Sequence, residues 1–277
     1  MVGVSPVVLD HYERFSLYNS PYPAHDSGCA IDLYPEGNDA VSPVAGEVLA
    51  TRTVRCPEQP YAVSEDSLLL VDCGAYVARI LHVDPAVELG ETVEIGDSLG
   101  TLVRSGFFGR WVDNHLHLGF RHPDQNLERA SGSLPIEIET PVAGVKWDGT
   151  GTIEETGATY VLLDSPTHGD PGFAALASDD GIPLDGGLPH YTGGGLLQSG
   201  DGPLRLLETT VGRPERNAVE WQDVAVYTNG VRATGLSLFA SQKGVGAKIV
   251  FHEGHEFVVG EQIQVTIEPT SDPITLS

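Results

Sequence analysis

Basic residues are scarce in this chain. Its 277 residues include 15 Lys plus Arg against 39 Asp plus Glu, a formal net charge of −24, and only Lys146, Lys243 and Lys248 are lysines. Without a basic cluster to neutralise phosphate, nucleic acids and anionic membranes are poor partners. Acid enrichment with few lysines is typical of halophiles that accumulate molar salt, because hydrated carboxylates keep the protein soluble and salt screens their repulsion. The composition therefore favours a halophilic archaeon as the source over an ordinary acidic protein.

Long apolar runs and a secretory signal are also missing. No window approaches the roughly 18 uninterrupted apolar residues of a membrane-spanning helix, so no membrane span is predicted. The N-terminal sequence MVGVSPVVLDHYERF has neither a basic n-region nor a long apolar h-region. The three cysteines, Cys29, Cys56 and Cys73, lack CxxC spacing and are odd in number, which favours reduced or buried thiols. A cytoplasmic location is the default expectation.

The apolar residues follow the period of strands rather than that of helices. Alternating runs at 67–72 and 76–83 flank a turn at Cys73-Gly74, and two glycine turns in 87–97 precede another run at 98–103. The 33 Gly and 19 Pro indicate a loop-rich globular chain. Short strands at regular spacing, without a helical period, predict an all-β fold, and the length suffices for two domains.

The sequence His115-Leu116-His117 lies within a run of β-forming residues from 111 to 120. On a strand, residues i and i+2 project from one face, so both imidazoles are expected in one site. Such a pair suits a divalent metal such as zinc, or a ligand beside a proton-transfer group, although it also occurs on solvated faces.

Five segments strengthen this interpretation because of their order. SPVAGEV, LLLVDCG, ILHV, VELGETVEIGDSLGTL and DNHLHLGF follow one another within residues 25–122. Together they resemble the lysostaphin-type (LytM-like) zinc metallopeptidases. The resemblance implies a duplicated-hybrid-motif β-sandwich or barrel domain, here followed by a second β-rich domain.

The same resemblance implies a set of site residues. Zn²⁺ would be bound by His25, Asp32 and His117, while His82 and His115 would flank the scissile carbonyl as catalytic residues. The implied reaction is hydrolysis of a peptide or other amide bond by water activated on the metal. The family has its first histidine four residues before the aspartate, where this chain has Gly28, and His25 lies seven before Asp32. A three-residue insertion would bring His25 to the metal; otherwise His25 is a solvated loop residue and metal binding is lost.

Two alternatives to a hydrolase remain open. One is a degenerate, non-catalytic member of the family that binds a ligand or a protein. The other is a phosphocarrier-like domain with His82 as the phosphorylated residue. The partner histidine of that carrier would fall near residues 65–67, where there is none.

The chain is expected to divide into three parts. Residues 1–24 are predicted to be a lead-in with little regular structure, 25–128 the peptidase-like domain, and 129–277 a β-rich domain. Within the last part, the Gly-, Asp- and Pro-rich stretch at 178–203 predicts a long mobile loop, and Asn229-Gly230 predicts a hairpin turn. Binding, scaffolding and homo-oligomerisation are the roles left for this part.

The remaining histidines carry weaker signals. His252 and His255 are three residues apart in a strand-rich run, whereas a zinc-binding helix needs two histidines four apart. His168 and His190 are expected in loops, facing solvent.

Overall fold

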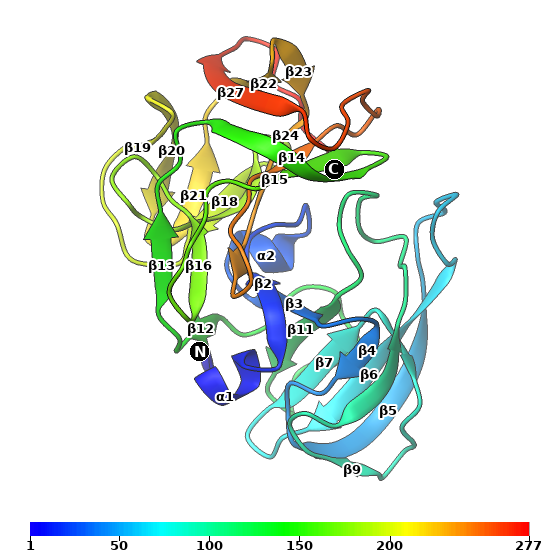
Figure 1. The fold of residues 1–277 in the computed structure, drawn as a ribbon. Coiled ribbons are helices and arrows are strands. Elements are labelled where there is room, and N and C mark those ends of the chain that lie inside the picture. Colours follow the sequence, from blue (N-terminus) through cyan, green and yellow to red (C-terminus); the bar gives the residue numbers. More distant parts are fainter. Residues whose placement is uncertain (277) are drawn as a thin grey trace. The chain divides into compact units, whose positions relative to one another are not determined.

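The structure is a computed structural model that describes residues 1–276 and is nearly all β (Figure 1). The described residues contain two short helices, α1 (Pro6–Leu9) and α2 (Pro23–Asp26), and neither has the length or the apolarity to cross a membrane. The chain forms two compact units, Met1–Phe15 with Ser27–Thr140 and Ser16–Asp26 with Pro141–Ser277. The predictions of an all-β fold and of a second β-rich domain are confirmed.

The first unit is built on a mostly antiparallel sheet. Its strand order is β2 (Tyr12–Ser16), β3 (Ala30–Pro35), β11 (Leu116–Arg121), β7 (Val77–Leu81), β6 (Glu65–Asp72), β5 (Gly46–Arg55) and β9 (Thr92–Val93). Fully buried apolar side chains such as Ile31, Leu69, Ile80 and Leu118 alternate along these strands and form the core. The turn predicted at Cys73-Gly74 joins β6 to β7, with Gly74 at a φ of 83°.

Two smaller sheets complete this unit. One has the order β4 (Asp39–Val41), β10 (Ser98–Leu102) and β8 (Val83–Pro85), and the other pairs β1 (Val2–Val4) in parallel with β12 (Ile136–Ile138). The prediction of little regular structure before residue 25 is therefore wrong. The stretch holds β1, α1 and β2, and Tyr12 and Phe15 are core residues. The partner strand of β1 lies more than a hundred residues away in the chain, so no local pattern signals this pairing.

The second unit contains a twelve-stranded sheet. Its order is β19 (Leu204–Leu206), β20 (Thr209–Glu215), β21 (Ala218–Trp221), β18 (Gly193–Leu196), β17 (Leu184–Leu188), β24 (Gly235–Leu238), β26 (Lys248–Val250), β15 (Tyr160–Leu163), β14 (Thr150–Gly157), β27 (Gln262–Pro269), β22 (Val224–Thr228) and β23 (Val231–Ala233). The same unit contains β13 (Val142–Val145), β16 (Phe173–Leu176) and β25 (Ala240–Ser241), which pair in that order and are not part of the twelve-stranded sheet. The predicted hairpin is confirmed as β22–β23, and both Asn229 and Gly230 have the positive φ that a tight hairpin turn requires.

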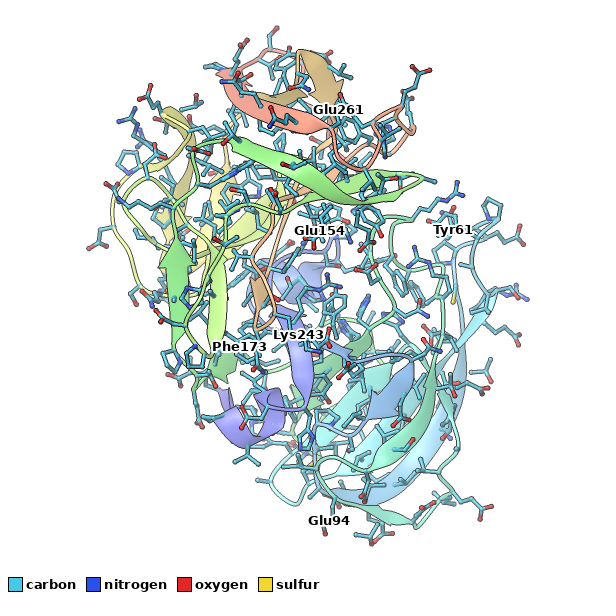
Figure 2. The ribbon with its side chains drawn as sticks, viewed as in Figure 1. Tyr61, Glu94, Glu154, Phe173, Lys243 and Glu261 are labelled. Atoms are coloured by element: carbon cyan, nitrogen blue, oxygen red, sulfur yellow. The ribbon has the colours of Figure 1, made fainter. Side chains whose placement is uncertain are left out.

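Two predictions for this unit are wrong. Residues 178–203 are not a long mobile loop, because they contain β17 and β18 and are largely buried. His190 is fully buried rather than solvent-facing. In contrast, the acidic residues Glu94 and Glu154 are exposed, and Glu94 lies at an outer edge in Figure 2.

Candidate metal centre

Strand register brings Asp32 and His117 together. In the antiparallel pair β3–β11, His117 lies directly opposite Asp32. Directly opposite residues project from the same face of a sheet. Nδ1 of His117 is accordingly 2.9 Å from Oδ1 of Asp32. The Asp32 side chain is buried, whereas that of His117 retains 17% exposure, so this pair meets solvent at the imidazole.

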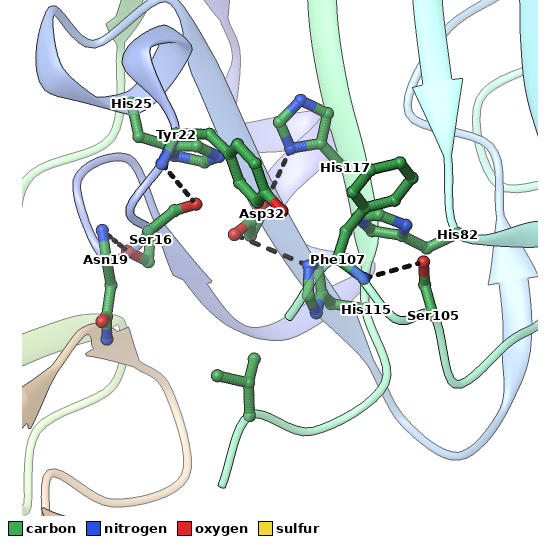
Figure 3. Close-up of polar contacts among 12 residues, drawn as sticks. Ser16, Asn19, Tyr22, His25, Asp32, His82, Ser105, Phe107, His115 and His117 are labelled. Carbon is green, nitrogen blue, oxygen red and sulfur yellow. Dashed lines mark hydrogen bonds and ion pairs between the residues drawn. The ribbon is translucent and has the colours of Figure 1, made fainter. Parts of the chain in front are cut away.

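His115 lies just before β11 and projects to the same face, as the sequence predicts. Its Nε2 is 3.6 Å from Oδ2 of Asp32 (Figure 3). Its Nδ1 is 2.9 Å from the carbonyl oxygen of Asp113. A carbonyl only accepts, so Nδ1 carries the proton. Burial lowers the pKa of His115 to about 4, although the charge of Asp32 opposes this, and the ring is neutral at pH 7. Two acceptors, Nε2 and Oδ2, therefore face each other, an arrangement that suits a cation or a water between them.

His82 follows β7, the strand on the other side of β11. Its ring centroid lies 4.9 Å from that of His115 and 5.8 Å from that of His117. Nδ1 of His82 is 2.6 Å from Oδ2 of Asp66, a carboxylate with no exposed side-chain surface. Burial raises the pKa of Asp66, but the hydrogen bonds and charge of His82 outweigh it and hold this pKa below its ordinary value.

Aromatic side chains surround the three imidazoles. The Phe108 ring centroid is 4.5 Å from that of His115 and 5.1 Å from that of His82. The Tyr34 ring centroid is 5.0 Å from that of His115, and that of Phe107 is 6.2 Å from that of His82. Apolar walls exclude water and strengthen electrostatic interactions inside the site.

Of the three predicted metal ligands, Asp32 and His117 lie in the first unit, and His25 lies in the second. His25 is buried in α2, and its Nδ1 is 2.7 Å from the carbonyl oxygen of Leu17. That carbonyl accepts the Nδ1 proton, which leaves Nε2 as the nitrogen that could bind a metal. Two imidazoles and a carboxylate are a donor set that fits zinc and leaves a position for water.

Two models of one family match successive parts of the chain. The model described as the N-terminal domain of a domain of unknown function, DUF8155, covers residues 3–138, and its C-terminal counterpart covers residues 143–268. The chain belongs to the DUF8155 family. A search of curated proteins finds no match. Among solved structures, the DUF8155 chain is weakly similar to the antimicrobial peptidase lysostaphin from Staphylococcus simulans, with 14% identity, a TM-score of 0.26, and coverage of 94% of this chain and 96% of that one.

The sequence prediction missed Asp66 as a site residue of the DUF8155 chain. A signal was present, since the turn at Cys73-Gly74 fixes the β6–β7 register, which runs from Asp72 opposite Val77 to Leu69 opposite Ile80. Extended by three pairs, this register brings residue 66 to the end of β7, beside His82. Phe108 was also missed, because it reaches the site from the irregular loop between β10 and β11 and no periodicity predicts its position.

Proposed function

We propose that this DUF8155 chain is a zinc-dependent hydrolase, similar to metallopeptidases, that cleaves a peptide or other amide bond. The observation that carries the proposal is the gathering of Asp32, His117, His115 and His82 on one face of β3, β11 and β7. A buried carboxylate surrounded by imidazoles provides both metal ligands and proton acceptors, which is the combination that amide hydrolysis requires.

His25, Asp32 and His117 would hold the zinc. When bound, a zinc ion polarises a carbonyl oxygen and lowers the pKa of water towards neutrality. Only six residues separate His25 from Asp32, so the chain itself limits how far the first ligand can lie from the second. Metal coordination fixes the position of the His25 imidazole, but it does not fix the number of residues between His25 and Asp32.

His82 and His115 would transfer protons and orient the attacking water. His82 accepts a proton from the attacking water, whose oxygen bonds to the amide carbon, and then gives that proton to the departing nitrogen as the C–N bond breaks. The products are a carboxylate and an amine. The neutral His115 orients the same water by accepting a hydrogen bond at Nε2. Phe107 and Phe108 keep bulk water from the reacting groups.

Metal content tests this proposal directly. The protein, purified in high salt because of its charge, is offered zinc and dialysed, and its metal is measured for the wild type and for His117→Ala and His25→Ala. We expect about one zinc per chain in the wild type and loss in both variants. The matched control is His122→Ala, which removes an exposed histidine beyond the end of β11 and leaves zinc binding unchanged.

The zinc-loaded wild type is then screened on a panel of peptides and simple amides. A wild-type protein that takes up no zinc would overturn the hydrolase and support the non-catalytic alternative. Zinc retained in His25→Ala would instead remove His25 from the ligand set and leave the rest of the site to be tested.

A further inference from the structure

Asp66 forms hydrogen bonds with both the main chain and the ring of His82. Its Oδ1 accepts the backbone N–H groups of Ser67, at 2.7 Å, and of His82, at 2.9 Å, and its Oδ2 is 2.6 Å from Nδ1 of the His82 ring. The Ser105 hydroxyl donates a further hydrogen bond to this carboxylate. All four donors are supplied to a side chain that has no solvent contact.

This arrangement decides which ring nitrogen of His82 carries the proton. An ionised carboxylate only accepts, so Nδ1 must donate to Oδ2. The neutral ring is therefore the Nδ1–H tautomer, and its lone pair is on Nε2, on the side of the ring away from Asp66. His115 and His117 lie within 6 Å of this ring, so the lone pair belongs to the same site.

The backbone of His82 supports a functional interpretation of this contact. Its φ is 69°, in the left-handed region that non-glycine residues rarely adopt. Residues in such regions are strained and persist where the surroundings hold them, often at functional sites. Here the N–H of His82 is held by Asp66, and its carbonyl accepts the N–H of Val103 at 2.9 Å.

We propose that Asp66 is a positioning residue that fixes His82 as the Nδ1–H tautomer, with Nε2 as the proton acceptor for the attacking water. The inference rests on the proposed hydrolase and assigns the proton transfer to His82 rather than to His115. The proton moves from water to Nε2 as the water oxygen bonds to the amide carbon. Asp66 keeps the Nδ1 proton in place and stabilises the positive ring until Nε2 releases its proton to the departing nitrogen.

The substitution Asp66→Asn distinguishes a residue that sets the tautomer of His82 from one that only holds the ring in place. Asparagine has one oxygen and one NH₂ group, and the two backbone N–H groups of Ser67 and His82 require the oxygen. The NH₂ group must then face Nδ1 of His82, which can only accept from it. We expect the ring to remain in place with its tautomer reversed, so that Nε2 carries the proton and cannot accept another.

The test is the protonation state of the ring nitrogens, measured by long-range ¹⁵N–¹H NMR on the full chain labelled in its histidine rings, at pH 8 in high salt. Signals of His82 are identified by their loss in His82→Asn, because asparagine tolerates a positive φ. We expect Nδ1–H in the wild type and Nε2–H in Asp66→Asn. The control is Asp72→Asn, at the other end of β6, where the carboxylate accepts the N–H of Gly74; it makes the same charge change and should leave the His82 tautomer unchanged.

Two results would overturn the proposal: an Nε2–H ring in the wild type, or an unchanged tautomer in a folded Asp66→Asn. The wild-type spectrum decides the tautomer even if Asp66→Asn does not fold. Zinc content is measured on the same samples and should be equal in wild type and Asp66→Asn. A protein without zinc but with the expected tautomers would remove the hydrolase and not the Asp66–His82 pairing. On any peptide that the wild type cleaves, Asp66→Asn should lose about 10- to 100-fold in kcat with little change in KM.

Discussion

Three buried histidines are held in three different ways, and each way limits what the ring can do. Asp66 holds His82 with a carboxylate, and the Asp113 carbonyl holds His115 with a neutral acceptor. His190, in the second unit, is packed so closely that a Cβ added at Gly235 or Gly187 would lie within 2.7 Å of its ring nitrogens. A carboxylate that would stabilise a positive ring lies 2.6 Å from Nδ1 of His82 and 3.6 Å from Nε2 of His115.

The buried ring of His190 should make the stability of the folded protein sensitive to acid. Burial lowers its pKa to about 3, although a hydrogen bond with Leu188 opposes this. Since the unfolded value is near 6.5, the unfolded chain binds a proton between pH 6.5 and 3 that the folded chain does not. The stabilisation is complete above pH 6.5 and is lost as the pH falls towards 3.

Urea unfolding in high salt at pH 7.5 and pH 4.5 measures this loss. Between these values the free energy of unfolding should fall by roughly 2–3 kcal/mol more in the wild type than in His190→Gln. Carboxylates titrate in both proteins, so the difference between them isolates His190. Equal losses in the two proteins would show that this ring can be protonated without disturbing the fold.

At the scale of elements, the turns were predictable and the pairings between distant strands were not. Cys73-Gly74 and Asn229-Gly230 are local signals, because glycine or asparagine must adopt a positive φ at these places. The β3–β11 register joins Asp32 to His117 across 85 residues, and no periodicity carries that information. The resemblance to lysostaphin-type peptidases did suggest this pair, because a family's set of site residues includes residues that are far apart in the sequence.

The stretch at 178–203 shows why composition misled the prediction. Its glycines allow close packing rather than movement. The buried Asp185 of β17 accepts hydrogen bonds from the Ser16 hydroxyl and from the N–H groups of Leu17 and Tyr18, at 2.6–3.1 Å. In β18, a Cβ at Gly195 would lie 2.1 Å from the Tyr18 ring. Glycine counts cannot distinguish a strand that packs against aromatic rings from a flexible loop.

Gly194→Ala tests this packing. Its Cβ would meet Cζ2 of Trp221 at 2.1 Å and the carbonyl oxygen of Asp185 at 2.7 Å. Overpacking of this kind should lower the free energy of unfolding by about 1–3 kcal/mol, measured by urea denaturation. In Gly169→Ala, the control, the added methyl group meets nothing within 4 Å and should change stability by no more than about 0.5 kcal/mol. Equal stabilities of the two variants would mean that β18 is as loose as the composition suggested.

At the scale of the whole molecule, some of the few basic residues are buried. Arg121 is buried and donates to the carbonyl oxygens of Asn126, Arg129 and Ser131, and Arg79 donates to that of Leu127. Lys248 is buried, with Nζ 4.2 Å from the centroid of the Tyr160 ring. These cations hold loops and pack against rings instead of balancing surface carboxylates. Three carboxylates, Asp32, Asp66 and Asp185, are buried as well, so the surface carries about the net charge of −24 that the sequence gives.

Repulsion among the surface carboxylates should make stability depend on salt, because molar salt shortens the Debye length to about 3 Å. From 0.2 M to 3 M KCl, we expect each thermal unfolding transition to rise by about 4–8 °C, as about 2 kcal/mol of stabilisation would give. A variant with five exposed acids replaced, Glu58→Lys, Asp124→Lys, Glu154→Lys, Asp170→Lys and Asp201→Lys, loses five negative charges and gains five positive ones. It should show a smaller rise and a higher Tm at low salt. Calorimetry of both proteins provides the comparison. A Tm that does not rise with KCl in the wild type would contradict the halophilic interpretation and leave an acidic protein adapted to ordinary ionic strength.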